Sequence, residues 1–297
     1  MKNCNRNNSP VTGEFVTLGN ERFYAINNVD KMAPFFVSVI SNSDHWLFVS
    51  STGGMTAGRV SPETALFPYI TVDRIHESDL HTGCKTLIRV NSDSEKNDWE
   101  PFNREHEDRF NITRNLYKNV LGNKLCFEEI NNDLQLVFRY TWATSDGYGF
   151  VRQCELESLS DKPLSVDLID GFQNILPAGT PRFTQTNSSN LVDAYKWTEL
   201  DDDSGIAFFT LFSGITDRAE PCESLKANTV FCLGLDETNI LLSSEQLADF
   251  RRGDQVKQET TKRGIRGAYL VNTTIALSPK ANKKWQLVAN IEQSQSQ

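Results

Sequence analysis

Apolar and polar residues alternate with a period of two along much of the chain after residue 115. In residues 134–142, the apolar side chains of Leu134, Leu136 and Phe138 fall on one face, as in a sheet covered on one side. Turn sequences such as Gly122-Asn123 separate these runs. The pattern predicts strands at residues 35–40, 46–49, 116–121, 124–130, 134–144, 148–159, 164–169, 194–200, 206–213, 230–235, 267–277 and 285–291.

Helical signals are few. Residues 243–253 combine a serine cap at Ser243, Gln246 three positions later and a closing Gly253, which predicts one short helix. Residues 101–114 fit either a turn of helix or an extended crossing. Because strands follow one another without alternating helices, we expect an all-β fold, a large antiparallel sandwich with one or two short helices.

The same pattern predicts a single folded domain. We expect it at residues 15–291, after a disordered or loosely held N-terminus at 1–14. Residues 292–297 are polar and are expected to be a C-terminal tail or the start of a linker.

Composition narrows the class of protein. The 297 residues carry a formal net charge of −9, which argues against a nucleic-acid surface built from clustered Lys and Arg. No window reaches the ~18 continuous apolar residues of a membrane span, and the N-terminus lacks the apolar core of a signal peptide. We therefore expect a cytoplasmic protein that binds neither nucleic acid nor membranes.

Motifs for metal, thiol or nucleotide chemistry are incomplete. The six cysteines are scattered without C-x-x-C pairs, so we expect core fillers and not disulfides or zinc ligands. His76 and His81 are spaced as in neither a helix face nor a metal motif. The run Gly53 to Val60 nearly spells a phosphate-binding loop, but Arg59 and Val60 replace its lysine and its Ser or Thr. We predict no metal and no cofactor.

Two other segments are distinctive. Residues 50–69 hold three glycines and two prolines, which predicts an ordered loop of fixed shape. Residues 170–177 predict a structural corner in which Asp170 and Asn174 bond backbone groups, with ligand contact as the alternative. No complete catalytic constellation is present in the sequence, and no pair of acids stands out as a glycosidase pair.

Several segments together resemble a known family. They are Trp46-x-Phe-Val-Ser-Ser-Thr-Gly-Gly54, Arg59, Phe67-Pro-Tyr69, Gly149-Phe-Val-Arg152, Asp170-Gly-Phe-Gln-Asn-Ile-Leu-Pro177 and Trp285-Gln-Leu-Val-Ala289. Over residues 15–291 the chain resembles the N-terminal domain of cellobiose phosphorylase-like proteins, inverting glycoside phosphorylases of the glycosyltransferase 36 type. The resemblance implies a β-supersandwich like that of galactose mutarotase, followed in such proteins by an (α/α)6 barrel with the catalytic aspartate.

The resemblance also implies a role and a site. In these phosphorylases a glycine-rich loop of the N-terminal domain reaches toward the active site of the neighbouring subunit in a dimer. The matching carbohydrate-binding positions are Ser51, Thr52, Gly53, Gly54 and Arg59, whose hydroxyl, N–H and guanidinium groups suit sugar hydroxyls or phosphate. The implied ligands are a disaccharide and inorganic phosphate. This chain would be a non-catalytic domain of a homodimeric glycoside phosphorylase or hydrolase.

Two alternatives stay open. A freestanding mutarotase-like epimerase needs a general acid and base, commonly histidine, and no histidine follows His106. A carbohydrate-binding sandwich would stack Trp99, Trp142 or Trp197 on sugar rings, whereas such tryptophans more often lie in the core.

Overall fold

A computed structural model describes residues 9–91, 96–106, 108–215 and 225–294. The described residues form three antiparallel sheets. The large sheet has eleven strands, in the spatial order β1 (Thr12–Leu18), β2 (Glu21–Asn27), β9 (Ile112–Asn119), β10 (Leu125–Asn131), β11 (Leu136–Ser145), β12 (Gly149–Ser158), β20 (Asn282–Ser294), β16 (Lys226–Leu233), β15 (Ile206–Leu211), β14 (Lys196–Asp201) and β18 (Thr261–Arg263). The prediction of an all-β antiparallel fold is confirmed.

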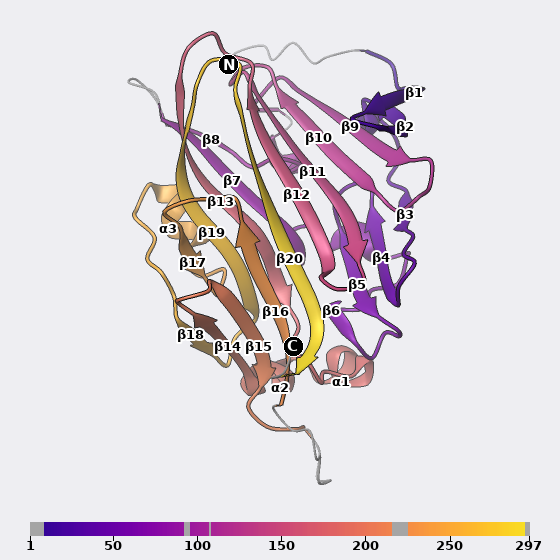
Figure 1. Ribbon diagram of the computed structural model, residues 1–297, viewed down its shortest axis with the longest axis vertical. Helices are drawn as coiled ribbons and strands as arrows, with labels where there is room; N and C mark the ends of the chain where they lie inside the picture. Colours follow the sequence, from indigo (N-terminus) through magenta and orange to yellow (C-terminus); the bar gives the residue numbers. More distant parts are fainter. Residues whose placement is uncertain (1–8, 92–95, 107, 216–224, 295–297) are drawn as a thin grey trace.

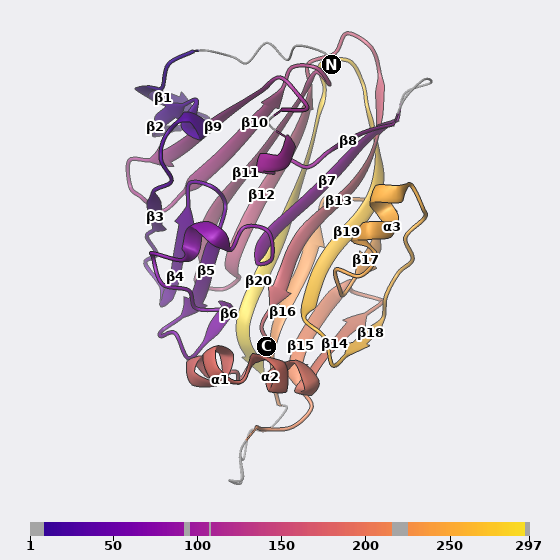
Figure 2. The same ribbon diagram turned by 180° about the vertical axis from the view of Figure 1, so that it is seen from behind.

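Two smaller sheets form the second layer (Figures 1 and 2). The five-stranded sheet has the order β17 (Asn239–Leu241), β19 (Gly267–Leu277), β13 (Leu164–Ile175), β7 (Gly83–Asn91) and β8 (Lys96–Trp99). The four-stranded sheet has the order β3 (Phe36–Val39), β4 (His45–Ser50), β5 (Met55–Arg59) and β6 (Ala65–Phe67). The two sheets meet where the N–H of Leu176 donates to the carbonyl of Leu66, 2.8 Å away.

The core lies between the two layers. Phe172 of β13 stacks on Trp142 of β11 with ring centroids 5.3 Å apart, and its edge meets Phe67 of β6 at 5.8 Å. One residue thus touches all three sheets. Alternate positions of the strands supply this core, since one face of each strand points inward.

Helices are short and peripheral in the described chain. They are α1 (Arg182–Asn187), α2 (Ser189–Tyr195), α3 (Leu247–Arg252) and the 3-10 turns η1 (Val29–Lys31), η2 (Ile75–Glu77) and η3 (Arg104–His106). There are three α-helices where we expected one or two. The helix predicted at 243–253 is confirmed as α3, closed by Gly253 at φ 89°. Its serine cap is wrong: Gln246 is the N-cap, and the Ser243 hydroxyl bonds Glu259 instead.

Other expectations need correction. Residues 50–69 are not one loop, because they contain the strands β5 and β6. Asp170 is not at a corner: it lies inside β13, which continues to Ile175 through a bulge where Asn174 takes φ 56°. Asp170 bonds side chains rather than the backbone. Residues 101–114 contain the turn η3 and then enter β9.

The boundaries of the expected domain meet the sheet at both ends. β1 begins at Thr12 and β20 ends at Ser294, so the first and last strands extend into the segments expected to be a loose N-terminus and a tail.

The cysteines and tryptophans largely serve the core. Cys126, Cys154, Trp99 and Trp142 are buried, and the described cysteines Cys84, Cys126, Cys154 and Cys232 are free thiols. Cys4 and Cys222 lie outside the described residues. Trp197 is half-buried, and the Arg263 guanidinium lies 4.0 Å from its ring centroid.

Candidate functional site

The turn from Ser50 to Gly54 reverses the chain between β4 and β5. The N–H of Ser50 donates to the carbonyl of Gly54 at 2.6 Å, and Gly53 takes φ 97°, a conformation that favours glycine. A Cβ at Gly54 would lie 2.0 Å from the carbonyl oxygen of Ile75. Both glycines are therefore required by the backbone, one for its φ angle and the other for close packing on η2.

Two cavities flank this turn. The first has about 50 Å³ and is lined by Thr52, Gly53, Asp79, Leu80, Cys84, Lys85, Thr86, Glu100, Pro101, Phe102, Asn103 and Tyr140. The second has about 220 Å³ and is lined by Val29, Asp30, Met32, Pro34, Ser51, Thr52, Phe102, Arg104 and Arg114. Thr52 and Phe102 border both cavities. We call the two cavities together the turn cleft.

Phe102 is held in a conformation unusual for its residue type. Its φ is 66°, in the left-handed region that bulky residues rarely adopt. Its N–H donates to the Glu129 carboxylate at 2.7 Å, and its ring packs edge-on against Tyr140 at 5.2 Å and Phe127 at 6.0 Å. Backbone strain of this kind persists only where surroundings fix it, and it is common at binding sites.

The Glu129 carboxylate organises the segment that carries Phe102. Glu129 is fully buried and accepts from the Trp99 indole at 2.6 Å and from Nε of Arg114, also at 2.6 Å. Arg114 donates in addition to the carbonyl of Asn103 at 3.0 Å. A single carboxylate from β10 thus fixes both ends of residues 99–103, which form one wall of the turn cleft.

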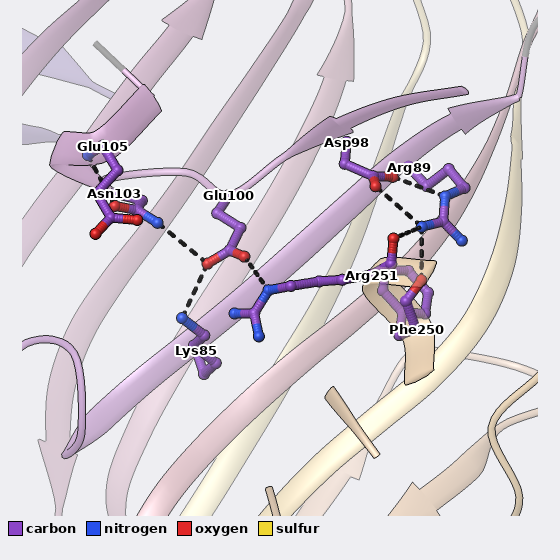
Figure 3. Close-up of polar contacts among 8 residues, drawn as sticks. All are labelled: Lys85, Arg89, Asp98, Glu100, Asn103, Glu105, Phe250 and Arg251. Atoms are coloured by element: carbon purple, nitrogen blue, oxygen red, sulfur yellow. Dashed lines mark hydrogen bonds and ion pairs between the residues drawn. The ribbon is translucent and has the colours of Figure 1, made fainter. Parts of the chain in front are cut away.

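A second charged cluster supplies Lys85, Glu100 and Asn103 to the lining of the smaller cavity, and Figure 3 shows its polar contacts. The Glu100 carboxylate accepts from Lys85 at 2.9 Å, from Arg251 at 2.6 Å and from Asn103 at 3.3 Å. Burial alone would raise the pKa of Glu100, but the hydrogen bond from Arg251 and the charge of Lys85 outweigh burial and lower the pKa to about 2. Glu100 is therefore a fixed anion.

Asp79, on the same cavity, has the opposite tendency. Burial raises its pKa, and the positive charges of Arg104 and Lys85 oppose that rise. Two carboxyls whose pKa values are pushed apart are the usual pattern of an acid and base pair. Here both oxygens of Glu100 are already bonded to cations, so this carboxylate is poorly suited to take a proton from a substrate.

Thiol chemistry is also disfavoured at this place. Burial raises the pKa of Cys84 to about 11, so its reactive thiolate form is scarce at neutral pH. The turn cleft therefore presents fixed hydrogen-bonding groups and an aromatic ring, which suit binding better than catalysis.

Three side chains at the turn form a hydrogen-bonded row. Ser50 Oγ lies 2.8 Å from Thr52 Oγ1 and 2.6 Å from His76 Nδ1. Ser50 Oγ also accepts the N–H of Thr52 at 3.2 Å. The row connects an imidazole on η2 with a hydroxyl that borders both cavities.

The structure separates the residues expected from sequence. Ser51, Thr52 and Gly53 line the turn cleft, and Gly54 supports it by packing on η2. Arg59 lies at the other end of β5, paired with His45 of β4, and lines neither cavity of the cleft.

The opposite wall was not foreseen. Phe102, Glu100 and Asp79 come from segments with no distinctive local pattern. One signal could have led to them: Glu129 falls in phase with the apolar residues Leu125 and Phe127, which places a carboxylate on the inward face of a strand.

A larger cavity of about 720 Å³ lies on the large sheet. Thr141, Gln153 and Gln286 form one row across β11, β12 and β20, and Arg139, Glu155 and Lys284 form the next. Arg139 donates to Glu128 and, at 2.5 Å, to Glu157. Among the described residues, no histidine lines this cavity.

Metal ligation and membrane crossing by a helix find no support in the part of the chain that the structure describes. There, no group of three or more His, Cys, Asp or Glu side chains could hold a metal ion. In the same residues, no helix is both long and apolar enough to cross a membrane.

Comparisons with known proteins give distant structural likenesses. No protein-family model and no curated protein matches the chain. Among solved structures, it is similar to a candidate aldose 1-epimerase from Escherichia coli K12, at 9% identity and TM-score 0.46, covering 88% of this chain and 99% of that one. A bacterial glucoamylase complexed with acarbose has 10% identity and TM-score 0.44, covering 99% of this chain and 35% of that one. A candidate kojibiose phosphorylase from the human microbiome has 11% identity and TM-score 0.33, covering 92% and 27%.

Proposed function

We propose that the turn cleft binds a sugar and that the chain is a non-catalytic, carbohydrate-associated domain. The observation that supports this most is Phe102, which is held at φ 66° and lines both cavities together with Thr52. An aromatic ring beside convergent polar groups suits a ligand that has an apolar ring face and hydroxyls at its edge.

The polar lining fits the same ligand class. In the larger cavity, Asp30 supplies acceptors, Arg104 supplies donors, and the Ser51 and Thr52 hydroxyls can do either. The Arg104 guanidinium also suits a phosphate or a sugar phosphate. Together with the resemblance of the sequence, this favours a domain of a glycoside phosphorylase or hydrolase, homodimeric at full length, in which the turn borders a disaccharide site completed elsewhere in the protein.

Binding can be tested on the chain itself. We expect that titration with cellobiose, and separately with inorganic phosphate, shifts the backbone NMR signals of residues 51–54 and 100–104 in a saturable way. Thr52→Val should weaken binding about 3- to 10-fold through one lost hydrogen bond. Thr274→Val, a matched change at an exposed site on β19, should leave binding unchanged. Absence of saturable shifts at the cleft would refute the proposal.

The non-catalytic role has its own test. Incubated with cellobiose and phosphate, the chain alone should release no sugar phosphate, because Glu100 and Cys84 are unsuited to proton transfer or nucleophilic attack. Sustained turnover by the purified chain would contradict this role.

A second candidate rests on the cavity of the large sheet. Its size and its rows of amide and charged side chains, among them Gln153, Gln286 and Arg139, would suit a carbohydrate on that face. NMR shifts at those three residues, with none at the cleft, would favour this alternative. Anomer exchange catalysed by the chain would favour the mutarotase-like alternative.

A further inference from the structure

The row His76–Ser50–Thr52 has only one hydroxyl proton to share at its centre. Ser50 is fully buried, so its Oγ is not exposed to water that could replace a protein partner. A hydroxyl offers one donor and two acceptor positions. Ser50 Oγ already accepts the Thr52 N–H, so its single proton must point either to His76 or to Thr52.

The proton on Nδ1 of His76 decides between these directions: Nδ1 accepts in the neutral Nε2–H tautomer and donates in the protonated ring or in the neutral Nδ1–H tautomer. When the neutral imidazole carries its proton on Nε2, Nδ1 is an acceptor, and Ser50 donates to it. Ser50 then accepts the Thr52 hydroxyl proton, and Thr52 offers the cleft only lone pairs. When His76 is protonated, Nδ1 donates to Ser50, Ser50 donates to Thr52, and the Thr52 proton is free to point into the cleft.

We propose that Ser50 and His76 are positioning residues that set whether Thr52 donates or accepts a hydrogen bond in the turn cleft. The inference rests on the proposed function for its effect on ligands, whereas the coupling itself is a property of the free chain. When Nδ1 of His76 is an acceptor, the Thr52 hydroxyl accepts a hydrogen bond from a ligand hydroxyl. When His76 is protonated, the Thr52 hydroxyl can also donate a hydrogen bond to a ligand group that only accepts, such as a carboxylate or a phosphate oxygen.

The hydrogen-bonded row through Ser50 is the direct connection between His76 and Thr52 in the described residues. The turn η2 packs against β4 and β5, whose titratable side chains, His45 and Arg59, face each other at the far end of the strands. On its own segment, the nearest charged groups in sequence are Asp73, Arg74, Glu77 and Asp79. In the described chain, none of these side chains is hydrogen-bonded to Thr52.

The coupling is testable without any ligand. Across about pH 5 to 8, where histidine titrates, the Thr52 amide signal should move with the same midpoint as the His76 ring signals. In Ser50→Ala, His76 should still titrate, but the Thr52 amide should lose that midpoint. Ser43→Ala is the matched control, because Ser43 Oγ lies 2.7 Å from Nδ1 of another histidine, His45, just as Ser50 Oγ lies near Nδ1 of His76. A Thr52 amide that keeps the His76 midpoint in Ser50→Ala would overturn the proposal.

A ligand experiment then measures the consequence. D-glucuronate should bind more tightly at about pH 5 than at about pH 8, and D-glucose should change less. Because the charge of His76 attracts an anion in any case, the informative quantity is the ratio of the glucuronate affinity at about pH 5 to that at about pH 8, compared between wild type and variants. We expect Ser50→Ala and Thr52→Val to reduce this ratio for glucuronate alike, by about 3- to 10-fold.

The outcomes separate the two proposals. If neither sugar binds while the ligand-free coupling is present, the proposed function fails and the row stands. If glucuronate binds and Ser50→Ala keeps the wild-type ratio, the row is not what directs Thr52, and the present inference fails alone.

Discussion

Arg152 and Asp170 form an ion pair that is closed off from water between the two layers. Both side chains are 0% exposed, and Nη1 of Arg152 lies 2.8 Å from Oδ1 of Asp170. Asp170 also accepts from the Trp285 indole at 2.7 Å and from Thr86 at 2.6 Å. Buried charges lose their hydration, and the hydrogen bonds that Asp170 accepts offset part of that loss, whereas the buried Nε of Arg152 has no hydrogen-bond partner in the described chain.

Breaking this pair should be severe. Arg152→Met leaves the Asp170 charge without its cation, so we expect the free energy of unfolding to fall by about 3–5 kcal/mol. Urea denaturation measures the change. The double variant Arg152→Met with Asp170→Leu removes both charges and should be more stable than the single variant. Equal stabilities for the single and double variants would contradict an uncompensated charge as the cause.

Glu100 contributes stability that depends on pH. Its folded pKa of about 2 lies below the ordinary value of 4.5, so the unfolded chain binds more protons between these values. The contribution is therefore complete above about pH 4.5 and disappears as pH falls toward about 2. Because the partner Arg251 is 44% exposed, solvent screening limits the contribution. We expect Glu100→Gln to lose about 1–3 kcal/mol near neutral pH.

The shape of the pH profile is the sharper measurement. Urea unfolding followed from neutral pH down to about pH 2 should show wild type losing more stability than Glu100→Gln, so that the two curves converge in acid. Parallel curves would mean that Glu100 is not the group responsible.

At the scale of single elements, the turn Ser50–Gly54 depends on contact with η2. In Gly54→Ala, the added methyl group would meet the Ile75 carbonyl oxygen, which belongs to the backbone and yields little. We expect a loss of about 1–3 kcal/mol and weaker ligand binding, because the turn must move away from the cleft. Gly147→Ala is the control, since nothing lies within 4 Å of that position. Comparable thermal unfolding of the two variants would argue against the contact.

The helix α3 is tied to β7 and β8 by one guanidinium group (Figure 3). Arg89 bonds Asp98 through Nε at 2.7 Å, and its Nη2 donates to the carbonyl of Phe250 at 2.6 Å. A lysine lacks the planar fork that makes both contacts at once. We expect Arg89→Lys to speed hydrogen exchange of residues 247–252 about 5- to 10-fold, with little change after Arg252→Lys, an exposed position. Unchanged exchange after Arg89→Lys would show that the other contacts of α3, among them its apolar packing and the Arg251–Glu100 ion pair, are sufficient to hold it.

Elements with a regular pattern were predictable, and elements held by distant contacts were not. The strands β9 to β12 are joined by turn sequences, and β11 and β12 alternate between buried and less buried positions, so local pattern was sufficient. The strands β5 and β6 were missed because Gly58 and Pro68 mark breaks in an isolated sequence, whereas here the pairing of β5 with β4 and of β6 with β5 decides the conformation.

The candidate site was predictable only on one side. Thr52 and its glycines form a local motif, but the opposite wall depends on Glu129, which bonds residues 27 and 30 positions earlier in the chain. Contacts between residues so far apart in the chain produce no periodic pattern in the sequence. The sequence does show a charged residue at a strand position where the alternation predicts an apolar one, as for Glu129, Arg152 and Asp170, and such positions indicate buried polar networks.

At the scale of the whole molecule, the last strand joins what earlier parts of the chain build. β20 pairs with β12 on one side and β16 on the other, so it bridges the β1–β12 half of the large sheet and the half made of β14, β15, β16 and β18. Figure 1 shows it running along the middle of the large sheet. Trp285 of β20 also donates to the buried Asp170 of the opposite layer. Such pairing between distant segments makes folding slow.

Removing β20 should therefore destroy the fold, and removing an edge strand should not. A chain ending at Ala281 lacks β20, so the facing edges of β12 and β16 lose their hydrogen-bonded partner. Because unpaired strand edges favour association between chains, we expect aggregation or no cooperative unfolding transition. Of the strands in the described residues, a chain lacking residues 1–19 loses β1, an edge strand that pairs with β2 and is mostly exposed, and it should still unfold cooperatively with a lowered midpoint. Circular dichroism during thermal and urea unfolding distinguishes the two cases. Cooperative unfolding of the chain ending at Ala281 would contradict this role of β20. It would mean that packing between the two layers, without the pairing of β20, is sufficient to hold the two halves of the large sheet together.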